Sequence, residues 1–178
     1  MSLRTILAPL SVVLVVVSCS VPDADTPAGV LTPSPSSQTS LPPSTALTTA
    51  LAAIEACDLL THEEATSLGV PAQGAPEEIL GLRRCDWATQ EGTVSTGINE
   101  ELGIDGLNLD DASSVSDVTI GRHQAKRVVE GSGPGYCSVA FAVGDSANIS
   151  VLALYLNDTP HACAIADRAA ALIEPKLP

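Results

Sequence analysis

Apolar and polar residues alternate with a period of two over most of the chain beyond residue 83. Such alternation in segments rich in β-branched residues predicts strands that bury one face. In one segment the buried face would carry Cys137, Val139, Phe141 and Val143, and Gly144-Asp145 would turn the chain into the next strand. We therefore expect an antiparallel sheet of five or six strands, over residues 83–89, 94–99, 116–121, 124–130, 136–143 and 147–156.

Before this region the apolar spacing is helical. Leu47, Leu51 and Ile54 predict a helix over residues 46–56. Thr61-His62-Glu63-Glu64 has the capping-box pattern, so a second, short helix should run from there to a stop at Gly69. The N-terminal part of the domain is therefore expected to be helical.

A longer helix is predicted at the C-terminal end. Thr159 is expected to cap it, with Pro160 in its first position. Its apolar stripe would cover the sheet and consists of Ala162, Ile165, Ala166, Ala169, Leu172 and Ile173. The pattern as a whole predicts an α+β fold, with N-terminal helices and this C-terminal helix packed on an antiparallel sheet.

The first residues have the pattern of an export signal. Arg4 precedes an apolar run from Thr5 to Val17, which is shorter than the about 20 residues that a membrane span needs. The run ends in Val16-Val17-Ser18-Cys19, which resembles the bacterial lipobox. We expect a lipoprotein signal peptide over residues 1–18 and a diacylglycerol thioether on Cys19. The alternative is a plain secretory signal followed by an incidental cysteine.

Residues 19–45 would be the lipidated cysteine and a tether, because residues 20–44 are rich in Pro, Ser and Thr and poor in bulky apolar residues. An extended tether of this length would reach roughly 75 Å. A single α+β domain over residues 46–178 would then be held outside the cell membrane, with the bilayer as its partner through the anchor on Cys19. A proline-motif docking site is the alternative for this segment.

The charge excludes some partners. The formal net charge is −13, and removal of the signal takes away only Arg4 and leaves 21 acidic side chains against seven basic ones. Phosphate backbones would repel such a chain, so nucleic acid is not expected as a partner. Only four aromatic residues are present, namely Trp87, Tyr136, Phe141 and Tyr155, too few for a stacking platform.

Four cysteines remain when Cys19 is assigned to the anchor, and outside the cytoplasm an even set indicates two disulfides. Three pairings are possible for Cys57, Cys85, Cys137 and Cys163. We favour Cys57 with Cys85 and Cys137 with Cys163, since each closes a local loop of about 26 to 28 residues.

No metal or cofactor is expected. The cysteines lack the C-x-x-C spacing of zinc sites. An acidic loop does not match the calcium-binding pattern, although it contains Asp105, Asn108, Asp110 and Asp111.

A family resemblance depends on an ordered set of segments: ACDLLTHEEATSLG, RRCDWA, VTIGRHQAKRV, GYCSVAFAV and ACAIADRAAALIEPKLP. Together they resemble the actinobacterial lipoproteins grouped as domain of unknown function 3558, over Ala53 to Pro178. The chain departs from the family at Ala56, where a proline is usual before the first domain cysteine. The resemblance implies an extracytoplasmic lipoprotein with two disulfides, and it supplies no catalytic residues to transfer.

Few residues suggest chemistry. None of the three histidines, His62, His123 and His161, lies in a recognisable catalytic motif. Ser132 lies in EGSGPG, which lacks the first glycine of G-x-S-x-G and suits a turn between strands. The strongest candidate for a partner contact is a basic cluster in an otherwise acidic chain, formed by Arg122, His123, Lys126 and Arg127. The alternative is that these residues form a solvated hairpin turn.

These observations favour a noncatalytic module of the cell envelope, anchored on the extracytoplasmic face, that binds an unidentified envelope protein or small ligand. The rival hypothesis is an envelope hydrolase that uses His161 or His123 with a nearby acid. Convergence of these histidines, or of one of them with Ser or Asp, in a pocket would favour the hydrolase.

Overall fold

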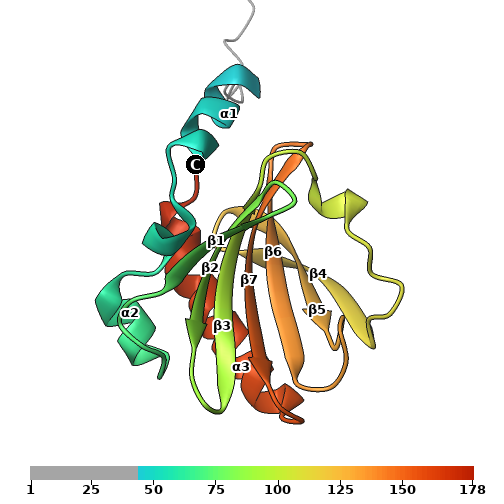
Figure 1. The fold of residues 1–178 in the computed structure, drawn as a ribbon. Coiled ribbons are helices and arrows are strands. Elements are labelled where there is room, and N and C mark those ends of the chain that lie inside the picture. Colours follow the sequence, from blue (N-terminus) through green and yellow to red (C-terminus); the bar gives the residue numbers. More distant parts are fainter. Residues whose placement is uncertain (1–43) are drawn as a thin grey trace, which may run out of the picture. The chain divides into compact units, whose positions relative to one another are not determined.

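The computed structural model describes residues 44–178, which contain a seven-stranded antiparallel sheet of order β1-β2-β3-β7-β6-β5-β4 (Figure 1). The α+β class is confirmed. The strands are β1 (Ala75–Ile79), β2 (Leu82–Ala88), β3 (Gly92–Asn99), β4 (Ser114–Ile120), β5 (His123–Val129), β6 (Tyr136–Val143) and β7 (Ala147–Tyr155). The last six lie where the alternation predicts strands, within two residues at each end.

The core lies between helix α3 (Thr159–Ile173) and one face of the sheet, where the helix packs on β6 and β7 (Figure 1). Cys137, Val139, Phe141 and Val143 are all buried on this face, as the period of two predicts. The hairpin of β6 and β7 is confirmed too, with Val143 opposite Ala147 across the turn. Ser138 and Ala140 on the other face of β6 are also buried, so that face is less exposed than simple alternation suggests.

Helix α3 begins one residue away from the expected cap. Asp158, not Thr159, is the N-cap, and its carboxylate accepts a hydrogen bond from the backbone N–H of His161 at 3.0 Å. The Thr159 hydroxyl instead accepts from the Gly135 N–H and donates to Glu130. The expectation for Thr159 is wrong because its hydroxyl joins the helix to the loop between β5 and β6, while the adjacent carboxylate caps the helix.

The N-terminal segments are shorter than the pattern suggests. Helix α1 (Ser44–Ala52) ends before residue 56, and a 3-10 turn, η1 (Ala56–Leu59), follows and packs against β2 and β3. Helix α2 (His62–Ser67) has the predicted capping box, in which Thr61 and Glu64 exchange hydrogen bonds. Gly69 ends this segment with φ +84°, a conformation that glycine adopts without strain. Two further 3-10 turns are η2 (Ile104–Gly106) and η3 (Glu174–Lys176).

Two disulfides join helical segments to the sheet within residues 44–178. Cys57–Cys85 links η1 to β2, and Cys137–Cys163 links β6 to α3. Both bonds are those that the short loop lengths favour. Each one therefore fixes a helical segment on the sheet face that it covers.

Strand β1 is the element that the sequence does not predict. All five of its residues are exposed, and it forms the edge of the sheet beside β2. The chain reaches it through Gly74, where a Cβ atom would collide with the sulfur of Cys85 and the ring of Trp87. Only a glycine allows so close an approach at this point.

The predicted signal peptide over residues 1–18, the lipidation of Cys19 and the tether up to residue 45 fall almost wholly outside the described residues. The predicted domain boundaries therefore stay predictions. Among the helices of the described part, none has the length and apolar character needed to cross a membrane.

Candidate functional site

The basic cluster lies where β4 turns into β5. The turn residue Arg122 faces the C-terminal end of α3: its backbone N–H donates to Glu174 Oε1 at 2.9 Å, and its guanidinium donates to the carbonyl of Leu177 at 2.6 Å. A Cβ at the other turn residue, Gly121, which has φ +56°, would collide with the Glu174 carboxylate. The turn is therefore fitted closely around this acid.

His123 contacts the same acid. Its Nδ1 lies 2.9 Å from Glu174 Oε1 and its Nε2 lies 3.2 Å from the carbonyl oxygen of Pro178. The backbone N–H of Arg122, followed by His123, holds the pKa of Glu174 below its usual value. We call Arg122, His123, Glu174, Leu177 and Pro178 the C-terminal latch, because these contacts hold the end of the chain on the β4–β5 turn.

The other two basic residues also have acidic partners. Lys126 pairs with Asp117 at 2.9 Å and with Asp105 at 3.3 Å. Arg127 makes two hydrogen bonds to Asp167 on α3, at 2.8 and 3.1 Å, which raise the pKa of its guanidinium. The positive charge of the cluster is thus largely neutralised by acidic residues of the chain. Its role as a partner contact stays a prediction.

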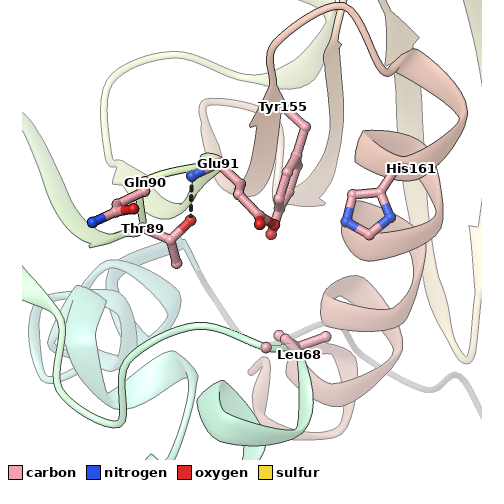
Figure 2. Close-up of a pocket in the computed structure, with 7 residues that line it drawn as sticks. Leu68, Thr89, Gln90, Glu91, Tyr155 and His161 are labelled. Carbon is pink, nitrogen blue, oxygen red and sulfur yellow. Dashed lines mark hydrogen bonds between the residues drawn. The ribbon is translucent and has the colours of Figure 1, made fainter.

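A cavity of about 410 Å³ lies at the opposite, N-terminal end of α3 (Figure 2). It is formed where the end of α2, the β2–β3 turn, the end of β7 and the first turn of α3 meet. Its lining consists of Leu68, Gly69, Thr89, Gln90, Glu91, Tyr155 and His161. Its volume is within the range of small-molecule sites, and its walls combine apolar, aromatic and charged groups.

Two rings form one wall of this cavity. Tyr155 and His161 meet edge to face, with ring centroids 4.4 Å apart and planes at 90°. Burial, and secondarily the charge of Glu91, raise the pKa of the Tyr155 hydroxyl, which therefore stays neutral at physiological pH. In Figure 2 the Glu91 carboxylate lies near the hydroxyl end of the tyrosine, and Leu68 lies below them.

The β2–β3 turn holds Glu91 at the cavity. The hydroxyl of Thr89 accepts a hydrogen bond from the N–H of Glu91 (Figure 2). It also accepts one from the N–H of Gly92 and donates to the carbonyl of Gly92. Because this hydroxyl is fully engaged in the turn, Thr89 orients the backbone of Glu91 and is not available as a nucleophile.

A second hollow, of about 550 Å³, lies beside the Cys57–Cys85 disulfide, and its lining includes Arg83, Arg84 and the acids Glu55, Asp58, Glu77 and Glu78. Arg83 pairs with Glu100, and Arg84 pairs with Glu77 and Asp86. The cations of this hollow are thus already bound to acids of the chain. It also lacks the aromatic wall of the first cavity, which we therefore take as the candidate site.

The three histidines do not converge. His62 is exposed on α2, His123 belongs to the C-terminal latch, and His161 lines the cavity at the other end of α3. The 15 residues of α3 separate the last two sites by about 22 Å. Over residues 44–178, no three His, Cys, Asp or Glu side chains lie together in a way that could hold a metal ion.

The sequence singled out His161 but missed Glu91 and Tyr155. These residues are distant in sequence and meet because β3 pairs with β7, which sets Gly92 opposite Tyr155. The scarcity of aromatic residues was the only available signal for Tyr155.

A family model described as a protein of unknown function (DUF3558) matches residues 14–176. No curated protein and no solved structure matches the chain.

Proposed function

The chain thus belongs to the DUF3558 family, whose function is unknown, and we propose that it is a lipid-anchored extracytoplasmic lipoprotein with a ligand-binding domain. The five cysteines of the chain carry this proposal. Four of them form two disulfides, which are typical of oxidising compartments outside the cytoplasm. The fifth, Cys19, comes directly after an apolar run with the pattern of a lipoprotein signal.

The anchor is tested by mass spectrometry of the full chain extracted from membranes. The expected product begins at Cys19 and carries added acyl mass, and Cys19→Ala should release the protein or leave it unprocessed. Membrane attachment of Cys19→Ala equal to that of the parent would contradict the anchor.

The cavity at the N-terminal end of α3 supports the binding role. It combines a carboxylate, a neutral hydroxyl and two rings within one hollow of about 410 Å³. The domain would act as a noncatalytic module that presents this cavity to an envelope protein or a small ligand. Native pull-down of the anchored protein, compared with a variant that carries Glu91→Gln, tests whether the cavity recruits a partner.

The alternative is an envelope hydrolase, and one observation favours it: His161 shares the cavity with the acid Glu91 and the hydroxyl of Tyr155. In such an enzyme His161 would activate a water molecule as general base. Hydrolysis of an ester or peptide substrate that is abolished by His161→Ala would support the enzyme over the binding module.

A further inference from the structure

The cavity at the N-terminal end of α3 offers a negative charge that the described chain does not neutralise. Residues 44–178 contain seven Lys and Arg side chains, and each one donates to an acceptor outside this cavity. In chain order, Arg83 pairs with Glu100, Arg84 with Glu77 and Asp86, Arg122 with the Leu177 carbonyl, Lys126 with Asp117 and Asp105, Arg127 with Asp167, Arg168 with the Ser67 carbonyl, and Lys176 with Glu64. Glu91 forms no ion pair within these residues. A cationic partner for it would therefore come from outside the described domain.

The ring wall is suited to the same sign of charge. The face of a neutral tyrosine ring attracts cations, and the attraction grows where water is excluded. Tyr155 is largely buried and keeps its proton, for the reasons given above. A cation within the cavity would thus meet the Glu91 carboxylate and the small part of the Tyr155 side chain that lines the cavity, because the ring is only 7% exposed and Gly92 and His161 pack against it.

The helix end does not reverse this preference. The N-terminus of a helix carries partial positive charge and would ordinarily attract an anion. Here the carboxylate of Asp158 already caps α3 and accepts from the N–H of His161. The N–H of His161 is thus not free for an anion, and an anionic ligand in the cavity would face the negative charge of Glu91.

We propose that this cavity binds a cationic nitrogen group, a primary ammonium or guanidinium, carried on a short aliphatic stem. The stem would pack on Leu68 and the rings, and the charged nitrogen would donate to Glu91. The inference depends on the proposed binding function of this domain and names its ligand chemistry. A free amine and the side chain of a Lys or Arg residue of a partner protein share this chemistry.

The test is an NMR titration of the full chain with n-butylammonium, and with n-butanol and butyrate as the neutral and anionic analogues. Butylammonium should bind at least about tenfold more tightly than either analogue. Its affinity should fall with added salt. Equal binding of butanol or butyrate, or no binding of butylammonium, would overturn the inference.

Glu91→Gln should weaken butylammonium binding by about tenfold and leave butanol unaffected. Glu78→Gln is the matched control, because Glu78 lines the second hollow. Equal losses in the two variants, or none in Glu91→Gln, would place the cation elsewhere and overturn the inference.

Two peptides distinguish the sources of the ligand. Acetyl-Ala-Lys-Ala-amide that binds more tightly than butylammonium would indicate a partner side chain, and weaker binding would indicate a free amine. Loss of binding on acetylation of the lysine is expected in either case, and retained binding would contradict a cationic ligand. The proposed anchor is tested separately by the mass of the chain, so that either proposal can fail while the other stands.

Discussion

At its C-terminal end, helix α3 is held by hydrogen bonds from the β4–β5 turn, whereas at its N-terminal end it borders an open cavity. The C-terminal latch brings Arg122 and His123 onto Glu174. The cavity brings Glu91 near Tyr155 and His161 without a cation from the described residues.

The difference between the two ends shows how a strongly acidic domain uses its few basic residues. Arg122 and His123 fasten the end of the chain, and Arg127 fastens the middle of α3 through Asp167. Conspicuous charge in the sequence thus has a structural use here. The cavity at the N-terminal end of α3 instead depends on Glu91, whose negative charge no cation of the described residues neutralises.

The largest effect is expected when the disulfide that holds α3 on the sheet is removed. The Cys137–Cys163 disulfide fixes α3 on β6, so the double variant Cys137→Ala and Cys163→Ala should lower the free energy of unfolding by about 2 to 5 kcal/mol. Denaturant unfolding of the oxidised protein measures this loss. A change below about 1 kcal/mol would mean that packing alone holds the helix.

A smaller effect is expected from Arg122→Ala, which removes the hydrogen bond to the carbonyl of Leu177 at the C-terminal latch. The free energy of unfolding should fall by about 1 kcal/mol, while butylammonium binding at the other end stays unchanged. Thermal unfolding and the titration are measured on the same sample. Weakened amine binding would show that the two ends are coupled.

Acid should weaken the latch in a defined direction. The pKa of Glu174 is lowered in the folded protein, so its contribution to stability is full above the unfolded value of about 4.3 and is lost as the pH falls through the folded value. Between pH 5 and pH 3 the melting temperature of the parent should therefore fall further than that of Glu174→Gln. Glu63→Gln of α2 is the control. Parallel pH profiles of the parent and Glu174→Gln would contradict the latch.

The smallest effects on stability are expected in the cavity. His161→Ala removes the edge contact with Tyr155 and should cost only about 0.5 kcal/mol, because His161 is exposed. Glu91→Gln should change the free energy of unfolding by less than about 0.5 kcal/mol. Denaturant unfolding of both variants checks this, and a larger loss in Glu91→Gln would indicate a structural role for that acid.

Most of the fold could be predicted because its strands alternate and its α3 helix has an apolar stripe. Strand β1 could not, since APEEI contains Pro76 and two acids, shows no alternation, and is extended through pairing with β2. The cap of α3 was misplaced because two adjacent residues, Asp158 and Thr159, can both cap a helix, and only tertiary contacts engage the hydroxyl elsewhere.

The sites were harder to predict. The basic turn was visible in the sequence, but its partners Asp167 and Glu174 lie 40 and 51 or more residues away. Local charge patterns carry no information on such pairing. The cavity likewise depends on the approach of the β2–β3 turn to the end of β7, which follows from strand order and not from any motif.

The account is tested most directly by mapping butylammonium on the full chain through backbone amide chemical shifts. We expect concentration-dependent shifts at the N-terminal end of α3, in Gly69, Glu91 and His161, and none at Arg122 or Glu174 of the C-terminal latch. Shifts that cluster at the latch, or that are equal at both ends of α3, would contradict the account.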